Sequence, residues 1–417
     1  MNSLISVDAA LNQILTSFQL LDVENVSLDD AFNRVLAKVQ IAADSLPPFP
    51  NSSMDGFAVR AADLHVTPIR LRVTGDIPAG KAPQFSIQAG EAARIMTGAQ
   101  MPEGADAVVP VEATDQNFRQ TGELDLPDFV QINQPVKAGD YVRPRGEDVQ
   151  AGQQVLAKGT LLGAAEIGLM AAMGISRVPV IRQPRVAILS TGDELLSPDQ
   201  PLTPGKIRDA NSYSLAALVR QYGGIPIRFA PAKDSLGAVR TRFEEALAEQ
   251  PNIILSSAGV SVGVFDVVRT VIAEMGHIDL WRINIRPGKP LAFGQVRGVP
   301  FFGLPGNPVS AMVTFDVFVR PTLLKLGGRN DDSTIVEATL EKPFRSDGRR
   351  TFMRVKLRRD TEHGRWIASE TGTQSSGALS SMALADGLLT IPEGLVETSL
   401  ETLYSVRLLR PIVQGLP

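Results

Sequence analysis

Residues 252–266 read NIILSSAGVSVGVFD, and this stretch predicts the architecture of the middle of the chain. Its apolar start, Ile253–Leu255, is typical of a short strand buried on both faces of a parallel sheet. The small Ser and Gly residues that follow leave room for backbone N–H groups to approach an anion. Open α/β sheets bind ligands where such a strand ends and a helix begins, so we expect a ligand-binding loop here.

Strand-like and helix-like segments alternate around this stretch, from VAILS (186–190) to a helix expected over about 307–326. This alternation predicts a mostly parallel sheet covered on both faces by helices. Upstream, an amphipathic helix over 7–20 and a second short helix over about 28–36 precede a Pro-rich break. Short alternating segments between about 56 and 142, and again after residue 328, predict two separate β regions.

We therefore predict a multidomain α/β plus β protein, because 417 residues exceed what one hydrophobic core serves. Four domains are expected: a helical N-terminal linker domain (1–46 with 143–182), an inserted small β domain (47–142), a central three-layer α/β/α domain (183–327) and a C-terminal β-barrel-like domain (328–417).

Composition excludes several classes of protein. The chain has no cysteine and three histidines, which rules out disulfides, iron–sulfur clusters and thiolate zinc sites. A metal held by protein must then be a hard cation on oxygen ligands, such as Mg²⁺. The net charge of −4 argues against nucleic acid, and no apolar run reaches the roughly 18 residues that span a bilayer. The N-terminus lacks the pattern of a signal peptide, so we expect a cytoplasmic protein.

Carboxylates follow three of the predicted strands. Glu194 lies in TGDEL after VAILS, Asp234 follows IRFAPAK, and Asp266 ends the opening stretch. Each one alone could be a helix N-cap or part of a solvated loop. Parallel strands bring their carboxyl ends to one edge of the sheet, so together the three favour a Mg²⁺ or substrate site.

Two Pro/Gly turns carry the candidates for anion binding. In WRINIRPGKP (281–290), prolines fix a turn that aims basic side chains outward, which suits a tetrahedral oxyanion and suits a solvated basic turn equally well. In GLPGNPVSA (303–311), Pro305 and Pro308 make a rigid turn before a helix. Ser310 and the N–H groups at that helix start could form a second anion site, or the turn could be structural only.

One pattern favours a different chemistry. Gly259 to Gly263 reads GVSVG and fits the G-x-S-x-G nucleophile elbow, with Ser261 as the nucleophile. A hydrolase also needs a downstream histidine, and His363 is the better placed one, in an expected hairpin turn. There is no G-x-G-x-x-G and no P-loop motif. A serine hydrolase is therefore an alternative with little support.

Seven segments in one order, covering essentially the whole chain, carry a resemblance: SSMDGFAV, RIMTGA, RPRGEDV, LSTGDEL, SSAGVSVG, RPGKP and GLPGNPVSA. On these segments the chain resembles the molybdenum insertases, which include bacterial MoeA and the E domain of gephyrin. The resemblance implies an enzyme that inserts molybdenum from molybdate into adenylylated molybdopterin, releases AMP and yields the molybdenum cofactor. It also implies a requirement for Mg²⁺.

The resemblance further implies a homodimer in which Asp55 and Thr97 reach into the partner subunit's site, with Asp148 and Arg143 in the same cleft. It places Mg²⁺ and the nucleotide at the three strand-end carboxylates, and molybdate near Lys289. The residues so implied are Asp55, Thr97, Asp148, Glu194 and Asp266 as catalytic; Ser257, Gly259, Ser261, Arg282, Arg286, Lys289, Pro305, Pro308, Ser310, Arg354 and Ser376 as cofactor-binding; and Glu194, Asp234 and Asp266 as metal ligands.

The resemblance also implies transient contacts with a molybdopterin adenylyltransferase and with recipient molybdoenzymes. The sequence departs from the family pattern at Ala258, where the usual SSGG has Gly, and at Arg282 and Arg286, where Lys is common. A guanidinium keeps the charge but not the geometry of an ammonium. A non-catalytic scaffold, as gephyrin's E domain is when it binds receptors, is a further alternative, and the intact strand-end carboxylates argue against it.

Overall fold

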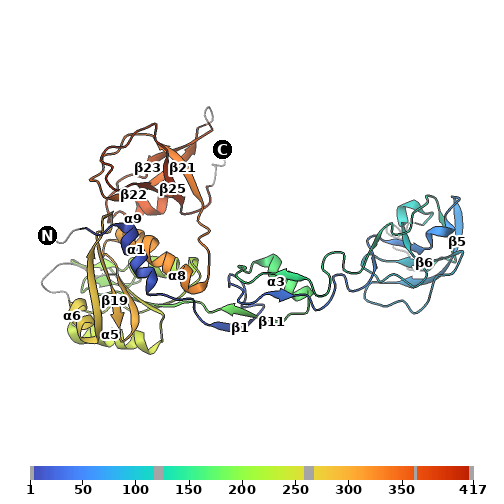
Figure 1. Cartoon of the computed structure of the whole chain (residues 1–417), viewed down its shortest axis with the longest axis horizontal. Helices are drawn as coiled ribbons and strands as arrows, with labels where there is room; N and C mark the ends of the chain where they lie inside the picture. Colours follow the sequence, from blue (N-terminus) through green and yellow to red (C-terminus); the bar gives the residue numbers. More distant parts are fainter. Residues whose placement is uncertain (1–3, 117–124, 258–266, 361–363, 413–417) are drawn as a thin grey trace. The chain divides into compact units, whose positions relative to one another are not determined.

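The structure is a computed structural model that describes residues 4–116, 125–257, 267–360 and 364–412 (Figure 1). The chain divides into two compact units. Unit 1 comprises residues 1–24, 33–35 and 179–417, and unit 2 comprises residues 25–32 and 36–178. Two of the boundaries between the units fall in β1 (Val23–Ser27) and β11 (Arg177–Ile181), and the other two flank residues 33–35. No helix in the described ranges is long and apolar enough to cross a membrane.

Unit 2 contains a five-stranded sheet in the order β7-β4-β6-β5-β8. Its strands are β4 (Gly56–Val59), β5 (Ile69–Ile77), β6 (Glu91–Ile95), β7 (Ala107–Pro110) and β8 (Phe129–Ile132), with 3-10 turns η1 (Ala61–Asp63) and η2 (Val111–Ala113). Side chains alternate between two cores, because Phe57 and Val109 pack on one face while Ala58 and Val108 pack on the other. The predicted strands of this region are confirmed.

The rest of unit 2 has one α-helix among its described residues, α3 (Ala164–Ala172). Short antiparallel pairs join distant segments: β2 (Gln40–Ile41) with β10 (Gln154–Leu156), and β3 (Asn51–Ser52) with β9 (Val142–Arg143). The helix predicted over about 28–36 is wrong. Ser27 Oγ donates to Asp30 at 2.7 Å and the Asp30 N–H donates to the Ser27 carbonyl at 3.2 Å, forming a turn that competes with helix.

Unit 1 is built on a six-stranded sheet in the order β15-β12-β16-β20-β19-β17. These strands are β12 (Arg185–Leu189), β15 (Ile225–Arg228), β16 (Ile253–Ser256), β17 (Gly276–Arg282), β19 (Pro290–Val296) and β20 (Val299–Gly303). The four from β15 to β20 are parallel to one another, and β19 pairs antiparallel with both β20 and β17, so β19 is the strand of this sheet that runs in the opposite direction. The mostly parallel sheet predicted from the alternation is therefore present.

Helices cover both faces of this sheet. Figure 1 shows α5 (Leu236–Ala248) and α6 (Val267–Met275) on one side, and α1 (Val7–Thr16) and α8 (Arg320–Gly327) on the other. Val186 and Ile188 of β12 pack with α1 and α4 (Asn211–Gln221), whereas Ala187 and Leu189 pack with α5 and α6. Burial on both faces explains the apolar runs of the central strands β12 and β16, whereas the edge strands β15 and β17 are more exposed and more polar. The remaining helices on the α1 side are α4 (Asn211–Gln221), α7 (Pro308–Thr314) and the π-helix η3 (Phe315–Val319).

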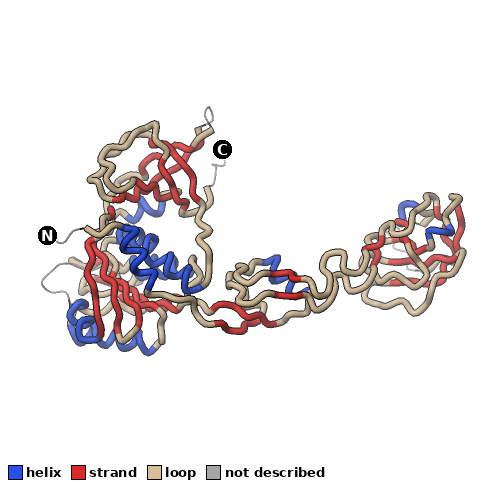
Figure 2. The backbone as a smooth tube through the Cα atoms, viewed as in Figure 1, coloured by secondary structure: helices blue, strands red, loops and turns tan. Residues whose placement is uncertain are grey.

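The C-terminal strands form a closed β-barrel, because β22 pairs with both β23 and β24 at the two ends of the series β22-β23-β21-β25-β24. They are β21 (Ile335–Leu340), β22 (Arg350–Arg359), β23 (Trp366–Glu370), β24 (Gly387–Ile391) and β25 (Tyr404–Leu408). The five strands predicted here are confirmed, and a short helix not predicted, α9 (Leu379–Leu384), lies between β23 and β24. Figure 2 shows these strands as a group separate from the large sheet.

Candidate functional site

A pocket of about 400 Å³ lies in unit 1 between the α/β part and the barrel. Four segments far apart in the sequence supply its walls. Its lining includes three cations and three serines but no carboxylate among the described residues. The lining residues are Arg286, Pro287, Gly288, Lys289, Ser310, Arg349, Gln374, Ser375 and Ser376. Cations and hydroxyl donors around one space suit an oxyanion ligand.

The RPGKP turn is fixed at this pocket by its backbone. The strand β18 (Ile285–Arg286) pairs in parallel with β22 of the barrel, which places Arg286 beside the barrel. The Lys289 carbonyl accepts a hydrogen bond from the Ile283 N–H at 2.8 Å. Gly288 has φ +105°, and a Cβ there would clash with the Thr314 hydroxyl of α7. Glycine is thus required for the turn to approach α7 so closely.

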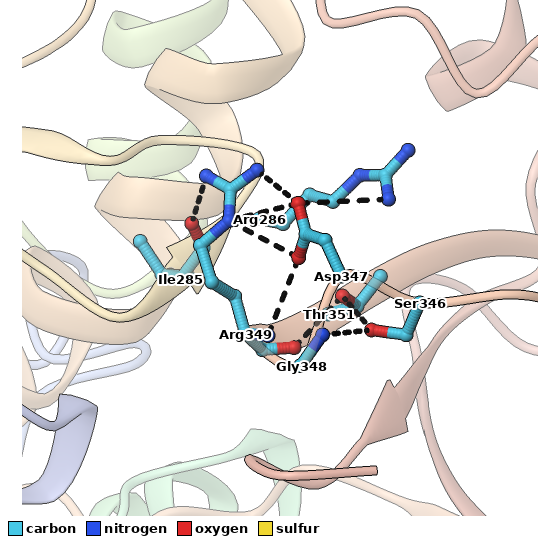
Figure 3. A network of polar contacts seen from close by, with 7 residues as sticks. All are labelled: Ile285, Arg286, Ser346, Asp347, Gly348, Arg349 and Thr351. Carbon is cyan, nitrogen blue, oxygen red and sulfur yellow. Dashed lines mark hydrogen bonds and ion pairs between the residues drawn. The ribbon is translucent and has the colours of Figure 1, made fainter. Parts of the chain in front are cut away.

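Arg349 is a cation of this pocket that the sequence did not single out. Figure 3 shows Asp347 between Arg349 and Arg286. Arg349 Nε donates to both carboxylate oxygens of Asp347, at 3.1 and 3.0 Å, and its Nη1 donates to the Ile285 carbonyl at 3.1 Å. Arg286 Nη1 lies 3.8 Å from Asp347. The hydrogen bond from Arg349, aided by the charge of Arg286, lowers the pKa of Asp347, so an ionised Asp347 holds both guanidinium groups.

The serine wall comes from α7 and a loop of the barrel. Pro305 precedes the turn and Pro308 begins α7, as predicted for the first helical position. Asn307 Nδ2 donates to Ser376 Oγ at 3.0 Å, and the Val309 N–H donates to the Ser376 carbonyl at 3.0 Å. These bonds dock the barrel loop onto the start of α7, where Ser310 is 4% exposed.

Arg354, expected to contact the anion, does not line the pocket. It is 1% exposed, and its Nη2 donates to the carbonyls of Thr373 and Ser375 at 3.2 and 3.1 Å. Burial lowers its pKa, and the charge of Arg286 lowers it further. Arg354 therefore supports the loop that carries Gln374 and Ser375, two lining residues that the sequence did not reveal. Arg282, at the exposed end of β17, also lies outside the lining.

The loops that follow β12 and β15 are joined by backbone hydrogen bonds. The Ala232 N–H donates to the Ser190 carbonyl at 2.9 Å, and the Gly192 N–H donates to the Ala232 carbonyl at 3.1 Å. These bonds join the loops after β12 and β15, which carry Glu194 and Asp234. Both side chains are exposed at the carboxyl ends of the strands.

Ser257 lies at the end of the adjacent strand, β16. It is 4% exposed, its N–H donates to the Leu189 carbonyl at 3.1 Å, and its Oγ lies 3.2 Å from Ser190 Oγ. No cluster of three or more His, Asp or Glu that could hold a metal occurs within the described ranges. The predicted residues outside those ranges are Gly259, Ser261 and Asp266, together with Ala258 and His363.

The remaining predicted residues belong to unit 2. Asp55 Oδ1 accepts hydrogen bonds from both the N–H and the Oγ1 of Thr97, at 2.7 and 2.6 Å, so the structure brings this pair together. Asp148 and Arg143 are exposed, and the Asp148 N–H donates to the Leu46 carbonyl at 3.0 Å.

A second pocket of about 420 Å³ has a different character. Apolar side chains dominate its lining, including Leu218, Met312 and Leu388, and its lining carboxylate Asp316 is 7% exposed. Burial raises the pKa of Asp316, against the opposing charges of Arg407 and Arg320. Of the two spaces, the one around Lys289 suits a small dianion.

Comparison with known proteins adds a family assignment. Residues 5–174 match the model of the MoeA N-terminal region (domain I and II), residues 187–325 a probable molybdopterin binding domain, and residues 337–399 the MoeA C-terminal region (domain IV). The chain is 39% identical over 399 residues to molybdopterin molybdenumtransferase 2 of Mycobacterium tuberculosis, covering 91% of this chain and 94% of that protein. It is 41% identical over 385 residues to molybdopterin molybdenumtransferase of Nostoc sp., covering 89% and 86%.

A solved structure agrees with these sequence matches. The crystal structure of the molybdopterin biosynthesis moea protein from Pyrococcus horikosii superposes with a TM-score of 0.79 at 32% identity. The match covers 98% of this chain and 100% of that one.

Proposed function

Because the chain belongs to the MoeA family and is a molybdopterin molybdenumtransferase of molybdenum cofactor biosynthesis, we propose that the pocket around Lys289 binds the substrate molybdate. The observation that carries this proposal is the charge of the lining: Arg286, Lys289 and Arg349 face one space with no carboxylate among its described lining residues. Molybdate is a tetrahedral dianion, and such a ligand needs charged donors around it.

Each group in the pocket has a distinct task. The guanidinium of Arg286 can bind two oxygens of the anion, and Lys289 acts as a compact point charge. Arg349, whose fork already binds Asp347 and the Ile285 carbonyl, can add its positive charge and its remaining Nη N–H groups. Ser310 and Ser376 donate hydroxyl hydrogen bonds to the remaining oxygens. The positive field holds the dianion while its metal is transferred to the dithiolene sulfurs of molybdopterin.

We place the nucleotide of adenylylated molybdopterin at the carboxyl edge of the sheet, with its phosphate near Ser257, Gly259 and Ser261. Glu194, Asp234 and Asp266 would hold Mg²⁺ there. An all-oxygen donor set suits this hard cation, which binds through one or two carboxylates plus substrate phosphates. The loops that carry Glu194 and Asp234 are joined by hydrogen bonds and could supply these one or two carboxylates. A larger cluster of carboxylates, which the described residues do not contain, is not needed. When bound, Mg²⁺ neutralises phosphate charge and polarises the bond to be cut.

We propose that the active unit is a homodimer, in which Asp55 and Thr97 of one subunit complete the site of the other, with Asp148 and Arg143 in the same cleft. The two hydrogen bonds from Thr97 hold the Asp55 carboxylate in one orientation, which supports a role at a composite site. We further propose a cytoplasmic enzyme with the four domains and three-layer central domain given above. Its transient partners would be the adenylyltransferase and the recipient molybdoenzymes.

The test is a reconstituted reaction. Full-length protein with adenylylated molybdopterin, molybdate and Mg²⁺ is expected to release AMP and to yield a molybdenum-containing pterin. Failure to release AMP would reject the proposed reaction and favour the scaffold alternative. Labelling of Ser261 by a fluorophosphonate would instead support the hydrolase alternative.

A further inference from the structure

We infer that Asn211 is a positioning residue that holds the GLPGNP turn in place as a wall of the oxyanion pocket; the inference rests on the proposed function of that pocket. Asn211 is the first residue of α4, and its Nδ2 donates to the Gly306 carbonyl at 2.8 Å. Asn211 does not line the pocket. It acts on the pocket through the turn that leads into α7.

The turn needs such support because of its composition. Pro305 and Pro308 have no N–H to donate, so the peptide units between them have fewer hydrogen bonds available to fix their orientation. The bond from Asn211 fixes the Gly306 carbonyl on the side of α4. On the side of the barrel, Asn307 and Val309 bond to Ser376. The turn is thus held between two parts of unit 1, and its orientation sets where Ser310 and Ser376 face the pocket.

Asn211 can position the turn because its own backbone is anchored. Asp209 is 4% exposed; its carboxylate accepts a bond from the Ser212 N–H at 3.0 Å, and its N–H donates to the Leu196 carbonyl at 2.9 Å. The Ile207 N–H donates to the Glu194 carbonyl at 2.8 Å. These contacts, with the pairing of β13 (Leu195–Leu196) and β14 (Ile207–Arg208), tie Asn211 to the loop that carries Glu194.

Only the donor end of the Asn211 amide serves this role. Its Oδ1 is buried without a hydrogen-bond partner among the described residues. Aspartate has the same shape but no donor, and its negative charge at the start of α4 favours the helix. Asn211→Asp therefore replaces the bond to Gly306 by repulsion between a carboxylate oxygen and the Gly306 carbonyl, which makes it the stronger perturbation of the turn. Asn211→Ala removes the same bond without adding a charge that could itself repel an anion.

The experiment measures molybdate binding to the full-length protein by calorimetry, with Mg²⁺–AMP binding in parallel. Both variants are expected to weaken molybdate binding about three- to tenfold, the effect of one lost hydrogen bond, and to leave AMP binding unchanged. Hydrogen exchange in the 305–312 segment is expected to speed up in both. Arg220→Gln, an exposed position in the last turn of α4, is the matched control and should behave as wild type.

Molybdate binding by Asn211→Ala equal to that of the wild type would overturn the inference while leaving the proposed pocket intact. If only Asn211→Asp weakened molybdate binding, the inference would also be overturned, because the added negative charge would then be the cause. If the wild type itself binds no molybdate, the proposed function of the pocket fails, and the positioning role falls with it. Should Asn211→Ala unfold, Asn211→Asp with unchanged exchange in the 305–312 segment would suffice to overturn it.

Discussion

The guanidinium of Arg354 donates to the carbonyl oxygen of Ser375 across 3.1 Å, from a side chain that is 1% exposed. Its second carbonyl acceptor, Thr373, and the hydroxyl of Ser381 complete a buried set of partners. Arg354 thus affects the pocket indirectly, through the loop that it supports, whereas Arg349 lines the pocket itself. The two arginines should respond differently to mutation.

Arg354→Met should destabilise the protein by about 2–4 kcal/mol, because buried carbonyls lose their charged donor. Molybdate binding should weaken only as the 373–376 loop loosens. Urea unfolding and calorimetry measure the two effects. A stable Arg354→Met protein that binds no molybdate would show instead that Arg354 is a ligand, as the family resemblance implied.

Arg349→Gln should lower the affinity for molybdate at least tenfold, since it removes one charge-assisted contact worth about 1.5–3 kcal/mol. Its stability should change by less than about 1 kcal/mol, because the side chain is partly exposed. The control is Arg345→Gln, an exposed arginine on the same segment that does not line the pocket. Equal affinities of the two variants would argue against a role for Arg349 as a ligand.

Removal of Mg²⁺ by EDTA should abolish AMP release, and addition of Mg²⁺ should restore it. Glu194→Gln should raise the Mg²⁺ concentration for half-maximal activity about tenfold, as one charged ligand is lost. Asp199→Asn, an exposed carboxylate a few residues along the same loop, is the control. An unchanged Mg²⁺ requirement in Glu194→Gln would exclude this side chain as a metal ligand.

Asp55→Asn and Asp266→Asn should each be inactive alone and should complement one another when subunits exchange. In a mixed homodimer, one of the two composite sites would contain both native carboxylates. When equal amounts of the two variants exchange subunits at random, half of the dimers are mixed and each mixed dimer has one intact site. About a quarter of the wild-type activity should therefore be restored. Failure to recover activity, under conditions in which tagged subunits demonstrably exchange, would contradict a shared site.

Asp331 predicts a pH dependence of stability. Burial opposes its ionisation, but hydrogen bonds from Arg320 and Ser333 outweigh burial and lower its pKa to about 2. A carboxyl whose pKa is lower in the folded state stabilises the protein above its usual pKa of about 4 and loses that effect as pH falls toward 2. Asp331→Asn should thus be less stable than wild type at pH 7, with the urea midpoints converging as the pH falls from about 4 toward 2.

The matched control for this pH effect is Asp332→Asn, which changes the adjacent exposed carboxylate. Its difference from wild type should stay small at every pH, since the ion pair with Arg320 belongs to Asp331, at 2.7 Å. A difference for Asp331→Asn that does not shrink on acidification would contradict the lowered pKa.

The sequence predicted the parts of the fold that depend on periodicity. The central strands β12 and β16 are apolar runs because both of their faces are buried, whereas β25 of the barrel begins with alternating buried and partly exposed residues. The helix expected over 28–36 was wrong because the contact between Ser27 and Asp30 is a local polar effect that apolar spacing does not report. The first helix ends at Thr16 rather than at residue 20.

For the pocket, the motifs indicated Arg286, Lys289 and Ser310, and the family resemblance implied Ser376; all four lie on one lining. Arg349 and Gln374 were missed because their position depends on how the barrel meets the α/β part, a tertiary relationship without a local sequence signal. A basic pair after a Gly turn, in SDGRR, is the only trace of Arg349 in the sequence. Arg354 was assigned to the anion because sequence cannot separate a ligand from the residue that supports a ligand-bearing loop.

The parallel pairing of β18 with β22 has a consequence for protein engineering. The dipeptide Ile285–Arg286 comes from the α/β part of the chain, yet it completes the sheet of the C-terminal barrel. In a chimera that joins residues up to 327 of one family member to the barrel of another, β18 and β22 would therefore come from different proteins. Their contact, which lies at the cationic pocket, would no longer be complementary. A working chimera should require that the RPGKP segment and the barrel come from the same parent protein. More than 40 residues of helix and strand separate these two segments in the sequence.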